Sequence, residues 1–328
     1  MRALVFEPVN KRVVHKDIPI NDPKSGEVKI KLKTAGLNRR DLFLISDLPN
    51  KKEPFVLGSD GAGIIVDLGE NVTNFNLGDE VIINPSLEWD SKEKVPNIPQ
   101  ILGSPTNGTF AEYVIVPKEN IVVKPDFLTW EDAGVLSLSA LTAYRALFTK
   151  GALQKGQHLL IPGIGGGVAT FALMFAKSIG AEVTVTSRNI KKLEKAKEMG
   201  ADRLLNSDDD WKTALEKHKV DLILDSIGPA TFPKYFDILK PNGTIVNFGR
   251  SSGSNINISL SEFFSSQFNI LGTSMGSKEE FVKMIQFISN HKIRPIIDQM
   301  YPLCDYQKAL SRMENGLQYG NIVLNIDL

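Results

Sequence analysis

The segment Leu159-Leu160-Ile161-Pro162-Gly163-Ile164-Gly165-Gly166-Gly167-Val168-Ala169 joins an apolar run to a dense group of glycines. From Val168 to Ile179, apolar side chains recur at spacings of three and four, the pattern of one helix face. A strand whose following glycines open a helix brings backbone N–H groups close to a pyrophosphate. The segment therefore predicts a phosphate-binding turn; the alternative is a tight turn without a ligand. A Cβ at Gly166 is expected to meet the ligand or a neighbouring strand, and a β-branched residue there is expected to disfavour the required backbone angles.

The sequence around this turn alternates between strand and helix patterns, which is typical of a parallel sheet with helices on both faces. Strands are expected at 158–162, 182–186, 220–225 and 244–248, and helices at 168–179 and 189–199. Residues 1 to about 125 instead predict short strands and turns, with a long loop at 85–108. An amphipathic helix at 279–290 and a strand at 322–326 are expected near the end.

The composition favours a cytoplasmic enzyme. The 328 residues suffice for two domains, and Lys+Arg and Asp+Glu balance at 38 each, which does not favour a nucleic-acid partner. The single cysteine, Cys304, can form neither an internal disulfide nor a thiolate cluster, as expected in a reducing compartment. The first residues lack a signal-peptide pattern, and no run approaches the roughly 20 apolar residues that span a membrane.

The end of the second expected strand, Thr186-Ser187-Arg188-Asn189-Ile190-Lys191-Lys192, indicates which nucleotide binds. NAD sites usually carry an acidic residue there for the ribose 2′-hydroxyl, whereas a 2′-phosphate requires cations. The first carboxylate here is Glu194, and bonds from Arg188 and Lys192 to a phosphate would contribute roughly 1.5–3 kcal/mol each. The sequence thus predicts NADP(H), unless these cations only form the solvated start of a helix.

Further motifs lie along the whole chain in a fixed order. They are Gly36-Leu37-Asn38-Arg39-Arg40-Asp41, Gly58-Ser59-Asp60-Gly61-Ala62-Gly63, Gly78-Asp79-Glu80-Val81, Gly108-Thr109-Phe110-Ala111-Glu112-Tyr113, Leu141-Thr142-Ala143-Tyr144, Asp225-Ser226-Ile227-Gly228, Asn247-Phe248-Gly249 and Gly320-Asn321-Ile322-Val323-Leu324. Their order and spacing resemble the medium-chain dehydrogenase/reductase family, closest to its quinone oxidoreductase and zinc-type alcohol dehydrogenase-like members. The resemblance implies an α/β protein with a GroES-like β-rich catalytic domain (1–125 and 270–328) and a Rossmann doubly wound parallel sheet (126–269).

The resemblance also implies a set of site residues. Asn38 and Thr142 are expected beside the nicotinamide, with Asp41 steadying the loop and Asp60 a candidate proton relay; structural alternatives are that Asn38 satisfies loop backbone, Asp41 caps a helix and Asp60 bonds within its loop. Arg39 and Arg40 are expected to be surface charges. The expected cofactor contacts are Asn38, Thr142, Gly163, Gly165, Gly166, Gly167, Val168, Ser187, Arg188, Lys192, Asp225, Ser226, Phe248, Gly249, Ser251 and Asn321.

No metal is expected. The positions at which zinc-dependent members carry catalytic ligands correspond here to Asn38, Ser59 and about Leu138, none of which is a thiolate, imidazole or carboxylate. The stretch 85–108, where those members hold a structural zinc, contains no cysteine. The resemblance then implies an NADPH-dependent oxidoreductase of quinones, enones or related carbonyl compounds. A fatty-acyl-type enoyl reductase and a low-turnover NADPH sensor are the alternatives, and a homodimer paired near Asn269 to Gly272 is expected.

Overall fold

The computed structural model describes residues 1–46, 53–104 and 106–326. The chain forms two compact units: unit 1 is Met1–Leu141 with Gly276–Leu328, and unit 2 is Thr142–Met275. The chain leaves unit 1 after Leu141 and returns to it at Gly276, whereas the boundaries were expected near 125 and 270. Residues 130–141 remain with unit 1 because they bond to it: Thr34 Oγ1 donates to the Trp130 carbonyl (2.5 Å), and the Leu138 N–H donates to Asp60 (2.7 Å).

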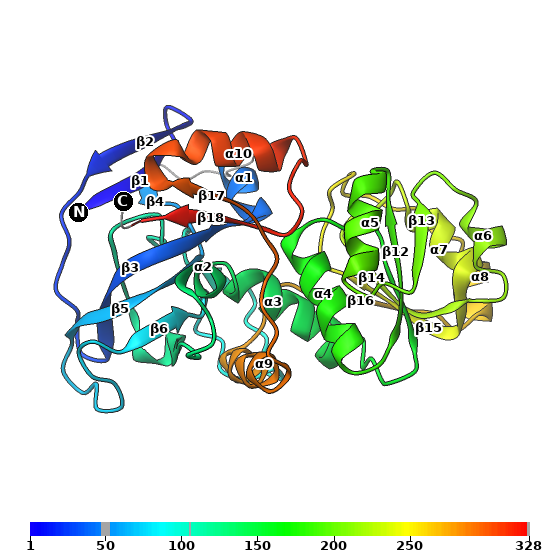
Figure 1. Cartoon of the computed structure of the whole chain (residues 1–328), viewed down its shortest axis with the longest axis horizontal. Coiled ribbons are helices and arrows are strands. Elements are labelled where there is room, and N and C mark those ends of the chain that lie inside the picture. The colour runs from blue at the N-terminus through cyan, green and yellow to red at the C-terminus, as the bar shows by residue number, and fades with distance from the viewer. Residues whose placement is uncertain (47–52, 105, 327–328) are drawn as a thin grey trace. The chain divides into compact units, whose positions relative to one another are not determined.

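Unit 2 is built on a six-stranded parallel sheet with the order β13-β12-β11-β14-β15-β16 (Figure 1). Its strands are β11 (His158–Ile161), β12 (Glu182–Ser187), β13 (Arg203–Asn206), β14 (Val220–Asp225), β15 (Leu239–Asn247) and β16 (Asn269–Gly272). The strand order changes direction between β11 and β14, and ligands bind outside the carboxyl ends of the strands at such a switch point. The expected doubly wound parallel sheet is confirmed.

The helices of unit 2 cover this sheet through apolar faces. They are α4 (Gly167–Ser178), α5 (Ile190–Glu198), α6 (Trp211–Ala214), α7 (Phe232–Ile238) and α8 (Leu260–Ser265). Helix α4 packs on β11 and β12, where Phe171 and Phe175 are fully buried, and α7 packs against β14. Asn189 caps α5 by accepting from the Lys191 N–H (3.0 Å). The helix that was expected from the spacing at 168–179 is thus present, beginning and ending one residue earlier.

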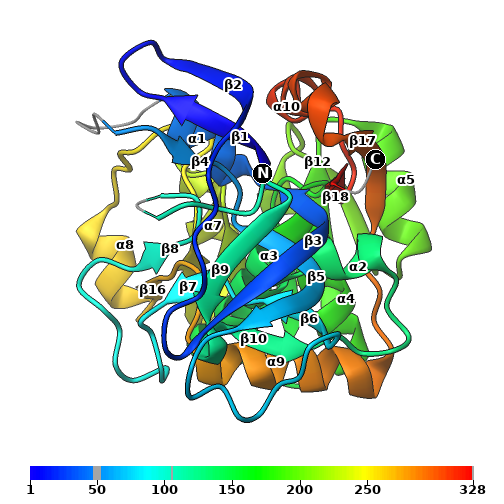
Figure 2. The ribbon, with the colours of Figure 1, turned by 90° about the vertical axis from the view of Figure 1, so that its left-hand side faces the viewer.

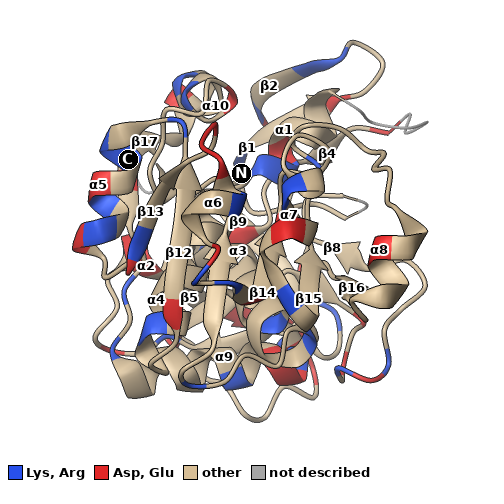
Figure 3. Ribbon diagram, turned by 90° about the vertical axis from the view of Figure 1, so that its right-hand side faces the viewer, with Lys and Arg blue, Asp and Glu red and all other residues tan. Residues whose placement is uncertain are grey.

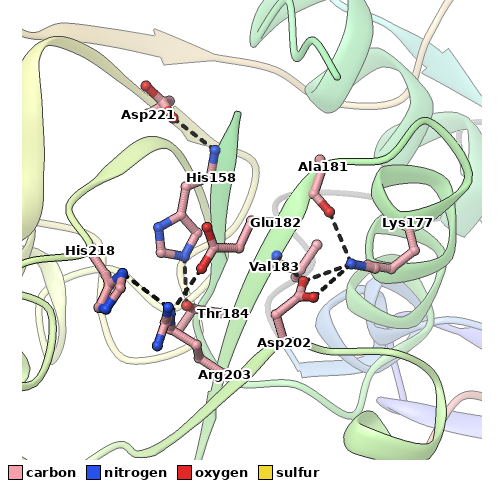
Figure 4. Close-up of polar contacts among 10 residues, drawn as sticks. All are labelled: His158, Lys177, Ala181, Glu182, Val183, Thr184, Asp202, Arg203, His218 and Asp221. Carbon is pink, nitrogen blue, oxygen red and sulfur yellow. Dashed lines mark hydrogen bonds and ion pairs between the residues drawn. The ribbon is translucent and has the colours of Figure 1, made fainter. Parts of the chain in front are cut away.

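A polar network binds together the amino ends of the strands in unit 2 (Figure 4). The buried His158 ring lies 2.7 Å from Thr184 Oγ1, and burial lowers the pKa of His158. Glu182 and Arg203, the first residues of β12 and β13, form an ion pair at 2.9 Å. This network lies at the opposite strand ends from the glycine turn that follows β11, so its bonds order the sheet.

Unit 1 contains a sheet of order β10-β6-β5-β3-β18-β17, with β9 also paired to β3, and a separate sheet β2-β1-β4 (Figure 2). Its longer strands are β1 (Arg2–Glu7), β2 (Arg12–Asp17), β3 (Glu27–Leu37), β5 (Asp60–Leu68), β6 (Glu80–Ile83), β9 (Tyr113–Pro117), β17 (Ile297–Pro302) and β18 (Asn321–Asn325). The short ones are β4 (Phe55–Val56), β7 (Ser86–Leu87), β8 (Gln100–Ile101) and β10 (Ile121–Val123). The antiparallel pair β7-β8 lies in the stretch 85–108, which was expected to be only a loop.

The central strand of unit 1 is β3, whose alternating side chains Val28, Ile30 and Leu32 are fully buried in the core. The helices are α1 (Arg39–Ser46), α2 (Trp130–Gly134), α3 (Ser137–Tyr144), α9 (Lys278–His291) and α10 (Tyr306–Glu314). Helix α1 follows β3 directly, and α3 begins near the start of β5, so that the end of β3, the start of β5 and the start of α3 come together. Among the described residues, no helix is both long and apolar enough to span a membrane.

Candidate functional site

The glycine turn after β11 adopts a backbone that glycine alone accommodates easily. Gly163 and Gly165 have φ values of +70° and +136°, in a region that L side chains rarely adopt. Gly166 is the N-cap of α4, and no side chain caps this helix. The N-terminus of α4 therefore offers backbone N–H groups and the positive end of the helix dipole, which suit a phosphate.

The structure corrects one expectation about Gly166. Its φ of −90° is ordinary for any residue, and an added Cβ would have no protein atom within 4 Å. The predictions that a side chain here would clash with a neighbouring strand and that the backbone angles would exclude β-branched residues are therefore wrong. The space beside Gly166 is open, and a ligand phosphate would fill it. The conformational demand lies instead at Gly163, where an added Cβ would come within 2.7 Å of Ile227 Cδ1.

The end of β12 is hydrogen-bonded to the glycine turn. Thr186 Oγ1 accepts from the Gly163 N–H (3.2 Å), and the Thr186 carbonyl accepts from the Ile164 N–H (2.8 Å). Ser187 is buried and its hydroxyl accepts from the Asn189 N–H (3.0 Å), so Ser187 shapes the next turn. Thr186 was not among the expected site residues, because its role depends on a partner 23 positions away.

The two cations expected at the 2′-phosphate occupy different places. Arg188 is exposed and has no hydrogen bond or ion pair with another described residue. Lys192 is half-buried and its side chain lies over the glycine turn: an added Cβ on Gly165 would be 2.9 Å from Lys192 Cδ and 3.0 Å from Nζ. Both stand near the carboxyl ends of β11 and β12, with Lys192 nearer the turn.

Asp225, at the end of β14, is fully occupied by protein donors. Its Oδ1 accepts from the N–H groups of Ile227 (2.9 Å) and Gly228 (3.1 Å) and from the Tyr235 hydroxyl (2.8 Å), and its Oδ2 accepts from Asn247 Nδ2 (2.8 Å). Burial, followed by the charge of Asp225, raises the pKa of Tyr235. The carboxylate thus fixes the turn after β14, and its four bonds leave it little capacity for a ligand.

The loop after β15 lies directly against the loop after β14. An added Cβ on Gly249 would be 2.9 Å from the Ser226 carbonyl oxygen, so this approach requires glycine. Ser251 donates from both its N–H (3.1 Å) and its hydroxyl (2.9 Å) to that carbonyl. The Phe248 N–H donates to the Asp225 carbonyl (2.9 Å). Ser226, Phe248, Gly249 and Ser251 therefore come together at the carboxyl ends of β14 and β15.

In unit 1 the structure joins Asn38, at the junction of β3 and α1, to Asp60, at the start of β5. Asn38 Nδ2 donates to Asp60 Oδ2 (3.0 Å) and, more weakly, to the Gly36 carbonyl (3.4 Å), while Asn38 Oδ1 accepts from Ser139 Oγ (3.3 Å). Asp41 Oδ2 accepts from the Asn38 N–H (2.8 Å). Both amide hydrogens of Asn38 are therefore engaged, and only its oxygen retains capacity for a further bond.

Burial changes the acidity of both carboxyl groups. Desolvation raises the pKa of Asp60 to about 7, against the bonds from Asn38 and the Leu138 N–H, which lower it. Desolvation also raises the pKa of Asp41 to about 6, and Asp41 Oδ1 has no hydrogen-bond partner among the described residues. Asp60 therefore titrates near neutrality, in the range useful for proton transfer.

These shifts predict a pH dependence of stability. Because Asp60 ionises near 3.9 in an unfolded chain and near 7 in the folded one, the folded state binds more protons between these values and loses stability as pH rises. Relative to Asp60→Asn, the wild type should lose about 4 kcal/mol of unfolding free energy over the whole window, of which roughly 2.5 kcal/mol falls between pH 5 and 8. Urea denaturation at pH 5, 6, 7 and 8 measures it. The amide adds only a pH-independent offset, and equal slopes for both proteins would place the Asp60 pKa near its ordinary value.

The three positions that hold zinc ligands in metal-dependent family members form no ligand set here. Ser59 Oγ donates to the Leu102 carbonyl (3.0 Å) and accepts from Arg40 Nη1 (3.1 Å), Asn38 bonds to Asp60, and Leu138 is apolar. Within residues 1–46, 53–104 and 106–326, no three His, Cys, Asp or Glu side chains are grouped as a metal site would require. The donors present at these positions do not suit zinc.

Arg39 and Arg40 behave differently. Arg39 is exposed, as expected. The expectation was wrong for Arg40, which is half-buried and bonds to Ser59, to the Leu102 carbonyl (3.2 Å) and to the Ser104 carbonyl (2.9 Å). Its partners lie 19 to 64 positions away, so local sequence gave no sign of them.

The remaining expected residues are divided between the units. Thr142 is buried at the start of unit 2, and Val168 is half-buried in the first turn of α4. Asn321, at the start of β18 in unit 1, donates from its backbone N–H (2.8 Å) and, more weakly, from Nδ2 (3.3 Å) to the Ile296 carbonyl. Asn38, Asp41, Asp60 and Asn321 thus belong to unit 1, and the other expected contacts belong to unit 2.

Known proteins resemble the chain over both units. The alcohol dehydrogenase GroES-like domain matches residues 24–126, and the zinc-binding dehydrogenase family matches residues 167–290. The zinc-type alcohol dehydrogenase-like protein YogA of Leptosphaeria maculans is 33% identical, over 98% of this chain and 96% of its own. A second zinc-type alcohol dehydrogenase-like protein, from Schizosaccharomyces pombe, is 33% identical over 92% of this chain and 91% of its own.

A solved structure gives the same result. The crystal structure of an NAD-dependent alcohol dehydrogenase superposes with a TM-score of 0.91 at 31% identity, and the match covers 99% of this chain and 100% of the other. The parallel sheet with its glycine turn, the β-rich unit 1 and these similarities agree, and the resemblance noted from the motifs is confirmed. The protein is an oxidoreductase that belongs to the medium-chain dehydrogenase/reductase superfamily.

Proposed function

We propose that the protein is a zinc-independent, NADPH-dependent cytoplasmic reductase of quinones, enones or related carbonyl compounds. The proposal rests on the three positions at which zinc-dependent family members carry ligands. Here they hold the amide of Asn38 and the hydroxyl of Ser59, both engaged in hydrogen bonds within the protein, and the apolar side chain of Leu138. Without a metal to polarise a simple carbonyl, conjugated acceptors are the better substrates, because their π-systems spread the negative charge that develops.

The residues of unit 2 fit a dinucleotide. The uncapped start of α4 and the open space beside Gly166 suit its pyrophosphate, and the loops held by Asp225 and Gly249 line the same edge of the sheet. When bound, the reduced cofactor supplies the hydride. The chain orients the cofactor through these turns, and Asp60, in unit 1, holds the Asn38 amide in one orientation.

The preference for NADPH rests on Arg188, which is exposed at the end of β12 with no acidic partner among the described residues. Alcohol dehydrogenases named NAD-dependent are among the relatives, so this preference distinguishes the chain from them. Cations at the first turn of α5 oppose its dipole, and an anionic ligand beside them would offset this cost.

Arg188→Ala is expected to weaken NADPH binding at least tenfold and leave NADH nearly unchanged, because only NADPH carries the 2′-phosphate. Lys192→Ala should weaken both cofactors, since its ammonium group lies beside Gly165 in the turn. The exposed Lys191→Ala is the matched control and should change neither. Fluorescence titration gives the affinities. An Arg188→Ala protein that loses NADH and NADPH equally would place Arg188 away from the 2′-phosphate.

The decisive experiment for the reaction is NADPH oxidation with a panel of quinones, α,β-unsaturated ketones and enoyl thioesters, using protein dialysed against a chelator. We expect turnover of quinones or enones at an undiminished rate after chelation. Elemental analysis that finds one tightly bound zinc per chain would contradict the metal-free mechanism. Turnover confined to enoyl thioesters would favour an enoyl reductase. Oxidation of alcohols with NAD would assign the activity for which the dehydrogenase relatives are named. Binding of NADPH without turnover would favour a sensor.

We also propose a homodimer paired through β16. This strand is an edge of the unit 2 sheet and pairs only with β15 among the described strands. Beside it in sequence, α8 exposes Leu260 and Phe264, four residues apart, and Figure 3 shows this helix with charge at one turn only. Light scattering should give twice the chain mass for the wild type and a smaller species for Phe264→Asp; a monomeric wild type would exclude the dimer.

A further inference from the structure

The side chain of Arg40 links three separate segments of unit 1. It extends from the first turn of α1, and its guanidinium donates from Nη1 to Ser59 Oγ (3.1 Å) and the Leu102 carbonyl (3.2 Å), and from Nη2 to the Ser104 carbonyl (2.9 Å). Ser59 stands at the position where zinc-dependent family members carry a histidine ligand. A protein cation therefore lies within hydrogen-bond distance of one of these ligand positions.

The guanidinium retains capacity for a ligand. Three of its five N–H donors are used, and one on Nε and one on Nη2 have no protein acceptor among the described residues. All three of its acceptors are neutral, and no carboxylate of the described chain forms an ion pair with it. The residue as a whole is half-buried.

Arg40 is partly desolvated, and two carboxylates act on its charge. Burial lowers the pKa of Arg40, while the charges of Asp41 and Asp60 raise it. Asp41 Oδ2 accepts from the Asn38 N–H, and Asp60 accepts from Asn38 Nδ2 and the Leu138 N–H, while Asp41 Oδ1 has no hydrogen-bond partner among the described residues. A cation that is partly desolvated and has only neutral partners gains from an anionic oxygen that completes its hydrogen bonds.

We propose that Arg40 binds the substrate oxygen on which negative charge develops during reduction, in place of a metal ion. This inference rests on the proposed reductase function. A quinone or enone that accepts hydride from the reduced nicotinamide gains two electrons, and its carbonyl π electrons move to oxygen, giving a phenolate or enolate. Water then protonates this anion, and the cofactor leaves oxidised. Arg40 holds the oxygen through its two remaining N–H donors and lowers the energy of the anionic product.

A purely structural role is the competing explanation, since the same three bonds join α1 to residues 102–104. The two roles differ in what they predict for a ligand. If Arg40 only joins these segments, removing it should not change the affinity of the protein for a small anion. If Arg40 binds the substrate oxygen, removing it should weaken the binding of an anion more than the binding of its neutral analogue.

The test uses 4-nitrophenolate as the probe, with the metal-free full-length protein and no cofactor. Binding is followed by absorbance above the pKa of the dye, and neutral nitrobenzene serves as the uncharged comparison. We expect Arg40→Met to weaken nitrophenolate binding at least tenfold and nitrobenzene binding little. Arg39→Met, which removes the exposed arginine next to Arg40, should bind both as the wild type does. Thermal melting confirms that each variant is folded.

Each outcome bears on the proposal. Equal nitrophenolate affinity in folded Arg40→Met, or no binding by the wild type, would overturn it. If Arg40→Met does not fold, the test uses the wild type labelled with 15N-arginine. The Nε resonance of Arg40 is identified because it is missing from the spectrum of Arg40→Lys, and nitrophenolate must shift it. A titration that leaves this resonance unmoved would also overturn the proposal. Nitrophenolate binding that needs Arg40, in a protein with no reductase activity, would preserve the anion site and reject the reductase function.

Discussion

Replacing Asp225 by alanine is expected to reduce the free energy of unfolding of unit 2 by about 3–5 kcal/mol. The reason is the number of donors that converge on one fully buried carboxylate: two backbone N–H groups, the Tyr235 hydroxyl and the Asn247 amide. Removing their acceptor leaves buried donors without a partner, and each such group costs about 1–3 kcal/mol. Urea denaturation followed by circular dichroism measures the loss.

A matched control lies at the other end of the same strand. Asp221 accepts from the His158 N–H (2.7 Å) and Lys240 Nζ (2.8 Å), but its side chain is 23% exposed, so water can replace its bonds. Asp221→Ala should cost roughly 1 kcal/mol. If Asp225→Ala costs no more than Asp221→Ala, the carboxylate is not the centre of the turn. Because Asp225 also fixes the loops after β14 and β15, the variant should bind NADPH poorly even where it remains folded.

The sequence was most informative where the structural demand is local. The glycine turn, the helix that follows it and the strands β11, β12 and β14 depend on residues within a dozen positions, and the structure has them nearly at the expected bounds. In contrast, β15 begins at Leu239, five residues before the expected 244, and β13 was not predicted. The alternation of Val28, Ile30 and Leu32 with Lys29 and Lys31 is likewise local, and its apolar side chains form the buried face of β3. The antiparallel pair β7-β8 was missed because two-residue strands have no detectable period.

The chemistry of the candidate site could not be predicted to the same degree. The pKa of Asp60 depends on burial and on partners 22 and 78 positions away, and the contacts of Arg40 extend over as many as 64 positions. No local pattern encodes such distances. The motif order identified the residues, but the structure alone distinguished the half-buried Arg40 from the exposed Arg39, and the fully bonded Asp225 from a carboxylate that is free to meet a ligand.

Gly166→Val should abolish NADPH binding, with at least 100-fold weaker affinity, and leave the fold intact. The two effects separate because the φ of −90° at Gly166 suits valine and an added Cβ meets no protein atom within 4 Å. The side chain would instead project into open space at the uncapped start of α4, where the pyrophosphate is expected. A 100-fold loss corresponds to about 2.8 kcal/mol of binding free energy.

A second glycine of the same turn makes this result specific. Gly163 has a φ of +70° and little room beside Ile227, so Gly163→Val should lose both stability and binding through strain in the turn. Thermal melting without cofactor and calorimetric titration with NADPH measure the two properties separately. If folded Gly166→Val binds NADPH as tightly as the wild type, the phosphate does not lie at this turn, and the position of the cofactor in unit 2 must be sought elsewhere.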